Sequence, residues 1–191
     1  MEAEEKKDKT KKPKKKKPSR TIETMFRSSM NNHIRLSEMA DQKAGLLVSI
    51  NAIIISIMTS LMVQQFTDNP SLLLPTCLLV LVCLLTITFA LLATKPSVKG
   101  KQNPPETPIK MDLLFFGSYT AIPLENYKIA LKEMMSKDET LHESLMENIY
   151  AQGLVLNRKY KLLSIAYTIF MFGFPLVLVS YLLTFYFILN L

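Results

Sequence analysis

Ten charged, polar or small residues follow one face of a predicted long helix between residues 21 and 65. At about 100° per residue they fall within a wedge of roughly 100°. This polar stripe consists of Arg27, Asn31, Arg35, Glu38, Gln42, Gly45, Ser49, Ala52, Ser56 and Ser60. Charged and amide side chains give way along it to small and hydroxyl side chains. Because lipid does not favour such a face, we expect it to meet another helix or water.

Two interpretations of the polar stripe are open. In the first, the stripe packs helices together, because it contains two pairs of small residues four positions apart, Gly45–Ser49 and Ser56–Ser60. That spacing lets helix backbones approach closely in lipid. In the second, copies of the stripe from several subunits surround a pore. The pore-lining residues would then be Gly45, Ser49, Ala52, Ser56 and Ser60.

A second flank of the same helix also carries polar or small side chains. Its members are His33, Ser37, Asp41, Ala44 and Asn51. This flank is expected to leave only a narrow arc for lipid. Asn51 lies near the middle of an apolar run, where a polar side chain is costly and often functional.

Cations and aromatic side chains that could bind a nucleotide are spread over three segments. Phosphate groups need cations, and bases need flat side chains on which to stack. The candidates are Arg27, Asn31, Arg35 and Lys43 on the first helix, Phe116 and Tyr119 in the middle of the chain, and Arg158 and Lys159 before the last apolar run. Simpler interpretations are a solvated or ion-paired helix face for Arg27 and Arg35, core packing for Phe116, and topology anchoring for Arg158 and Lys159. Arg27 and Arg35 are the stronger candidates because they lie on the polar stripe.

The sequence contains no recognisable catalytic or metal-binding constellation. It has two isolated histidines, His33 and His142, and no P-loop, G-x-S-x-G motif or cysteine cluster. Cys77 and Cys83 lie six positions apart in an apolar run and are expected to be packing residues. We therefore expect no enzymatic activity, no metal site and no cofactor.

Three apolar runs must position these side chains in a membrane. Residues 44–63 are 20 positions without a charge, the length that crosses a hydrocarbon core of about 30 Å. The other runs are residues 72–93 and 162–191. We expect an all-α membrane protein with three transmembrane helices, the first and third extended into the cytoplasm, and a small cytoplasmic layer.

The distribution of basic residues predicts the topology. All 23 Lys and Arg residues lie in residues 1–43 and 94–161, and the loop 64–71 has none. By the positive-inside rule both basic segments are cytoplasmic, so the N-terminus is inside and the C-terminus outside.

The predicted cytoplasmic parts differ in composition. Residues 1–20 form a lysine-rich tail that is expected to be disordered, and that could attract anionic lipid or nucleic acid or serve only solubility and topology. Residues 21–43 form a helix continuous with the first span.

Residues 94–161 are expected to begin with a loop, followed by a strand or tucked loop over Ile109–Tyr119. Two helices should follow. The first runs from Pro123 to about Met135, and the second is capped by Asp138 and continues into the third span. The third run is 30 residues long, so it must tilt or kink, and Gly173–Pro175 is the natural kink site.

Several short motifs, in order from about residue 21 to 175, resemble those of the Pycsar-type transmembrane effector domain. They are Met25-Phe26-Arg27, Asn32-His33, Leu36-Ser37, Ala40-Asp41, Lys43-Ala44, Asn51-Ala52, Ala93-Thr94-Lys95-Pro96, Phe115-Phe116-Gly117-Ser118, Gly153 to Leu156 and Lys159-Tyr160-Lys161. The basic tail lies outside the resemblance.

The resemblance implies an effector of bacterial antiphage defence that receives a nucleotide signal and damages the inner membrane. The expected partners are a cyclic nucleotide or short oligonucleotide, the membrane, and a companion enzyme that synthesises the nucleotide. A pore requires a homo-oligomer, for which a tetramer is one option, because three helices cannot enclose an aqueous path. Two other interpretations are a membrane-anchored scaffold that recruits a partner or nucleic acid, and a ligand-independent toxin of the holin kind.

Overall fold

The computed structural model describes residues 20–96, 113–120 and 122–190, without the side chains of 63–68, 116 and 117. Three long helices dominate this part of the chain: α1 (Arg20–Asp68), α2 (Leu73–Thr94) and α5 (Asp138–Leu189). A short 3-10 turn, η1 (Pro70–Leu72), joins α1 to α2. The predictions for the basic tail and for the loop after the second span lie outside the described residues, except that Arg20 already belongs to α1.

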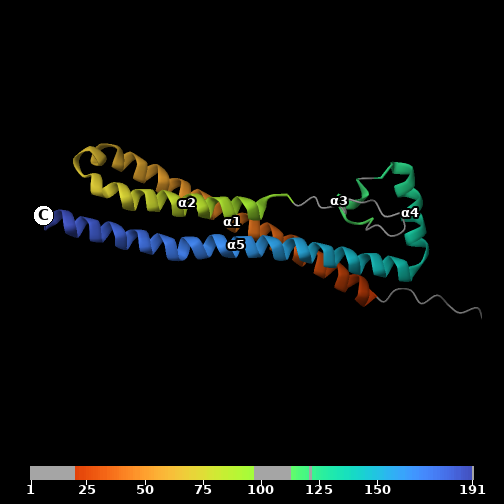
Figure 1. Cartoon of the computed structure of the whole chain (residues 1–191). Helices are drawn as coiled ribbons and strands as arrows, with labels where there is room; N and C mark the ends of the chain where they lie inside the picture. The colour runs from red at the N-terminus through yellow and green to blue at the C-terminus, as the bar shows by residue number, and fades with distance from the viewer. Residues whose placement is uncertain (1–19, 97–112, 121, 191) are drawn as a thin grey trace, which may run out of the picture.

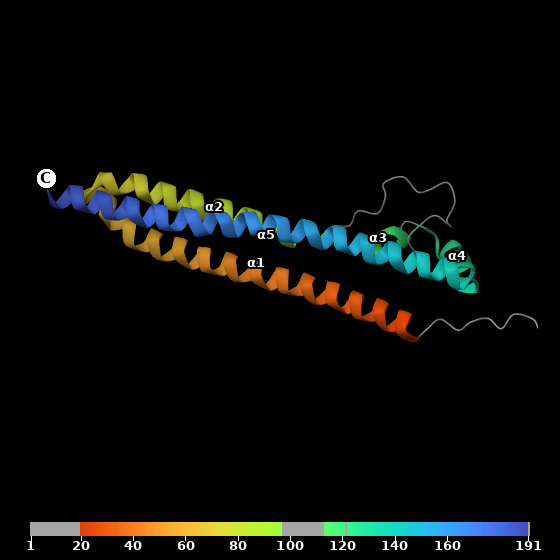
Figure 2. The same ribbon diagram turned by 90° about the horizontal axis from the view of Figure 1, so that it is seen from below.

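The long helices form one elongated bundle in which α1, α2 and α5 lie side by side (Figures 1 and 2). The described residues contain no strand, and all three helices are long and apolar enough to cross a membrane. The expectation of an all-α membrane protein with three transmembrane helices is confirmed. The start of α1 and the polar start of α5 lie at one end of the bundle, and the α1–α2 turn and the C-terminus lie at the other (Figure 1).

Two small helices complete the end of the bundle where α5 begins: α3 (Phe116–Tyr119) and α4 (Leu124–Ser136). In the described part of Ile109–Tyr119 the predicted strand is absent: residues 113–115 form a loop in which Leu113 is buried, and residues 116–119 form α3. The carbonyl of Phe115 accepts hydrogen bonds from the amides of Ser118 and Tyr119, and these bonds close a helical turn.

The predicted helix boundaries near α4 and α5 shift by one residue. Pro123 is the N-cap of α4 rather than its first residue, and Lys137 rather than Asp138 occupies the N-cap of α5. Asp138 and Glu139 instead lie in the first turn of α5, where the helix dipole favours negative charge.

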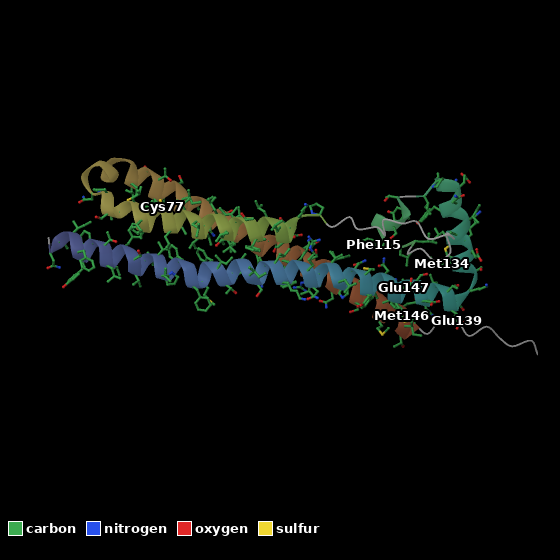
Figure 3. The ribbon with its side chains drawn as sticks, viewed as in Figure 1. Cys77, Phe115, Met134, Glu139, Met146 and Glu147 are labelled. Carbon is green, nitrogen blue, oxygen red and sulfur yellow. The ribbon has the colours of Figure 1, made fainter. Side chains whose placement is uncertain are left out.

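Small side chains bring the three long helices together. One buried cluster contains Ala40, Ala44, Leu47, Ala90, Ala93, Leu163 and Ala166. In lipid the hydrophobic effect does not drive helices together, so their association depends on close van der Waals packing. Small residues are favoured between helices because they allow the backbones to approach closely. A second cluster includes Leu79, Val82, Cys83 and Val177. Cys83 is buried in that cluster and Cys77 is exposed on α2 (Figure 3), and both thiols are free.

Helix α5 is 52 residues long and continues through Gly173 and Pro175. At 1.5 Å per residue its length is about 78 Å. The residues expected to kink it therefore do not interrupt it. At Gly173 the helix approaches α2 closely, since a Cβ built there would lie 2.7 Å from Cγ1 of Val82.

We predict that the end of the bundle holding the start of α1 faces the cytoplasm, because the basic residues lie on that side of the spans. A reporter inserted between Gly100 and Lys101 should therefore be active as a cytoplasmic fusion. A reporter after Leu191 should be active only as a periplasmic one. A cytoplasmic signal from the second fusion would contradict the three-span topology.

Candidate functional site

Apart from Glu38, which also lines a cavity between α1 and α5, the polar stripe lies on the side of α1 that the rest of the chain does not cover. All ten of its residues are exposed, from Arg27 to Ser60. The face of α1 that packs against α2 and α5 is marked by the buried Ala40, Ala44 and Leu47. At about 100° per residue, the centre of the stripe is roughly 160° from that packed face.

A separate arc of α1 carries exposed large apolar residues at membrane depth. They are Leu46, Ile50, Ile53, Ile57 and Leu61. In its membrane part α1 therefore presents three faces: a packed face, an apolar face suited to lipid, and the small and hydroxyl face of the polar stripe.

The second polar flank, from His33 to Asn51, lies on the packed face. This flank therefore does not face lipid, in agreement with the expected narrow lipid arc, and the structure adds that the chain's own helices are what lies against it. Asn51 is 0% exposed, and its Nδ2 donates a hydrogen bond to the Leu47 carbonyl at 2.8 Å. Its Oδ1 has no partner.

The predicted ligand-binding residues occupy separate surfaces within one chain. Arg27, Asn31, Arg35 and Lys43 are exposed on α1. Tyr119 stacks at a tilt on Tyr127, with 5.2 Å between ring centroids, and the Phe116 side chain lies outside the described part. Arg158 is exposed in a shallow groove that it shares with Lys161, whereas Lys159 points toward α1.

Lys159 joins α5 to α1 through three hydrogen bonds. Its Nζ donates to both carboxylate oxygens of Asp41 at 2.8 Å and to Oγ of Ser37 at 2.9 Å. An ammonium has three N–H donors, so this Lys159 cluster (Lys159, Asp41 and Ser37) uses all of them. Nearby, the Tyr160 hydroxyl donates to the Leu36 carbonyl at 3.1 Å. The cluster thus fixes α5 against the packed face of α1 near the predicted membrane boundary.

A juxtamembrane cavity of about 560 Å³ lies beside the Lys159 cluster. Its walls come from α1, the end of α2, the segment before α3, and α5. Besides the cluster, its lining includes His33, Glu38, Thr94, Phe115 (labelled in Figure 3) and Gln152. Buried Nδ1 of His33 has no hydrogen-bond partner, and Nε2 of Gln152 donates to Oδ1 of Asn148 at 2.8 Å. The cavity therefore combines charged, neutral polar and aromatic groups.

Sequence reasoning placed Lys159 among the candidates but missed its partners. Ser37 and Asp41 are four positions apart and so share a face of α1, at the predicted membrane boundary where Lys159 also lies. Opposite charges at the same membrane depth on two predicted helices were the available signal. These charges would have predicted the ion pair between Lys159 and Asp41 only on the assumption that α1 and α5 are neighbours.

Comparison with known families identifies the chain's relatives. The sequence model of the Pycsar effector protein domain matches residues 24–186. Comparisons with curated proteins and with solved structures give no match. The match includes α2, nearly all of α1 and α5, the whole polar stripe, and the Lys159 cluster. The chain therefore belongs to the Pycsar effector family, as a transmembrane effector of antiphage defence.

Proposed function

We propose that the protein is a nucleotide-gated, pore-forming effector of the bacterial inner membrane. The observation that carries this proposal is the exposure of the polar stripe at membrane depth. Gly45, Ser49, Ala52, Ser56 and Ser60 face away from the chain's own helices, and lipid is a poor neighbour for hydroxyl groups. A second subunit and water are the neighbours that suit them.

A closed ring of subunits satisfies all three faces of α1. The polar stripe then faces the axis of the ring, the apolar face from Leu46 to Leu61 faces lipid, and the packed face contacts the subunit's own α2 and α5. Cyclic symmetry is common among homo-oligomers and gives each copy of α1 the same environment. A tetramer is one such assembly.

The polar half of the stripe would form the cytoplasmic mouth of this pore. Copies of Arg27 and Arg35 would converge there and attract an anionic nucleotide, made by a companion enzyme, since like charges focused at a mouth raise the local concentration of counter-ions. The family membership supports a cyclic nucleotide as the signal.

The general test is dye release from liposomes that contain the full-length protein. Release that depends on an added cyclic nucleotide is the expected result. Liposomes that stay intact with every cyclic nucleotide would instead favour the membrane-anchored scaffold. Release without any nucleotide would favour a ligand-independent toxin.

Replacement of Arg35 with alanine should weaken the response to nucleotide without changing the open pore. Arg35 shares the stripe with Ser56 but lies 21 residues away, or about 31 Å along the helix. We expect the nucleotide concentration for half-maximal release to rise by about three- to tenfold, because electrostatic attraction at the mouth is reduced. Single-channel conductance should stay the same. An unchanged concentration dependence would remove Arg35 from the ligand path.

A further inference from the structure

The juxtamembrane cavity contains a lysine whose three donors are held by an anion and a hydroxyl of the chain itself. We propose that this cavity is the receptor site for a single nucleotide, and that the nucleotide's phosphate displaces Asp41 from Lys159. This inference rests on the nucleotide gating proposed above. It assigns the site and the contact through which the signal acts.

The geometry of the Lys159 cluster makes the phosphate a direct competitor of Asp41. Lys159 gives two of its donors to the Asp41 carboxylate and the third to Ser37. A phosphate oxygen needs the same donors, so both anions cannot be fully bonded at once.

The two partners of the ion pair differ in their access to water. The Asp41 side chain is 44% exposed, whereas the Lys159 side chain is 15% exposed. Because its side chain is already partly exposed, Asp41 can be hydrated by solvent after it leaves Lys159. Lys159 would keep an anionic partner, because leaving a largely buried ammonium unpaired is costly.

The rest of the cavity suits one base. Its volume of about 560 Å³ lies within the range of pockets that enclose small ligands, which favours a single nucleotide over an oligonucleotide. Phe115 offers an aromatic face, and Gln152 offers an amide. The unpartnered Nδ1 of His33 is a buried polar atom that a base edge could satisfy.

Displacement of Asp41 would act on the helix that carries the polar stripe. The Lys159 cluster is one of the side-chain links between α5 and α1, together with the Tyr160 hydrogen bond to the Leu36 carbonyl. A ligand that binds only when Asp41 has left stabilises states in which α1 is less firmly held. The orientation of the stripe would then change with occupancy of the cavity.

Two variants that break the same ion pair should shift the response in opposite directions. The assay is dye release by the full-length protein in liposomes, with each of the four 3′,5′-cyclic nucleoside monophosphates of adenosine, guanosine, cytidine and uridine. Asp41→Asn removes the competing charge, so the half-maximal concentration should fall by about tenfold. Lys159→Gln removes the phosphate ligand, so it should rise by about 100-fold. Lys159→Arg keeps the charge and should retain most of the response.

Lys161→Gln is the matched control, because it removes one charge from the other side of α5 and should leave the response unchanged. If Asp41→Asn and Lys159→Gln shift the half-maximal nucleotide concentration equally and in the same direction, the ion pair is merely structural. The proposed receptor site would then be overturned, while nucleotide gating would stand. A wild-type protein that responds to none of the four nucleotides would refute both. Native electrophoresis of each variant confirms that the oligomer is intact, and Lys159→Arg supplies the charge test if Lys159→Gln does not assemble.

Discussion

Replacing Ser56 with leucine should abolish nucleotide-dependent conductance while leaving the oligomer assembled. Ser56 is exposed in the membrane half of the polar stripe. In a ring of subunits, every copy of the substitution would face the axis at the same depth. The hydroxyl face would become an apolar constriction, and such constrictions block conduction by dewetting. The measurements are single-channel recording in planar bilayers and the mass of the complex in detergent.

Ser164→Leu is the control for the Ser56 variant. Ser164 is also exposed, but it lies on α5, so the same gain in volume and apolarity should leave conductance close to that of the wild type. A Ser56 variant that falls apart into monomers would show that the stripe packs helices, because a larger side chain separates closely packed backbones. Normal conductance with an intact oligomer would exclude this face of α1 from the pore.

The spans were predictable because each depends on a property of the sequence alone. An uncharged run of 20 residues can satisfy its backbone in lipid only as a helix. No proline follows Pro123 until Pro175, so the polar start of α5 was expected to continue into the third span. Helical periodicity likewise identified the polar stripe, because the angle between residues on one helix does not depend on its neighbours.

The contacts between helices were not predictable in the same way. Lys159 and Asp41 are 118 positions apart, and the angular position of Asp41 on α1 does not say which helix covers it. For the same reason the sequence indicated that the flank from His33 to Asn51 leaves little of α1 for lipid, but not that it packs against the chain itself. The juxtamembrane cavity needs four segments to exist, so it could not be found from any one of them.

The short α3 shows a different limit. Eleven residues from Ile109 to Tyr119 are too few for periodicity to separate strand from helix. The outcome for the described part depends on local hydrogen bonds to the Phe115 carbonyl. Gly173 illustrates a third limit: the sequence Gly173-Phe174-Pro175 is typical of a kink, but it does not show that the glycine also allows a close approach between α2 and α5.

Gly173→Ala should therefore destabilise the bundle by about 1–3 kcal/mol, the usual cost of adding a methyl group to a packed interior. The new Cβ would lie 2.7 Å from Cγ1 and 3.0 Å from Cγ2 of Val82. Val82 is 8% exposed, and its branched side chain has one strongly preferred rotamer in a helix, so it cannot simply turn away. The measurement is the midpoint of thermal or SDS-induced unfolding in detergent. Gly45→Ala is the control, since a Cβ there meets nothing within 4 Å.

The double variant Gly173→Ala with Val82→Ala decides whether that close approach is the cause. Val82→Ala removes the two methyl groups that the new Cβ would meet, and on its own it should cost about 1–2 kcal/mol through the space it leaves. In combination the two substitutions should be less destabilising than the sum of their separate effects, because each fills or vacates the same space. Strictly additive costs would mean that α2 and α5 do not approach each other at these positions, and the helix packing described for the membrane part of the bundle would then be wrong.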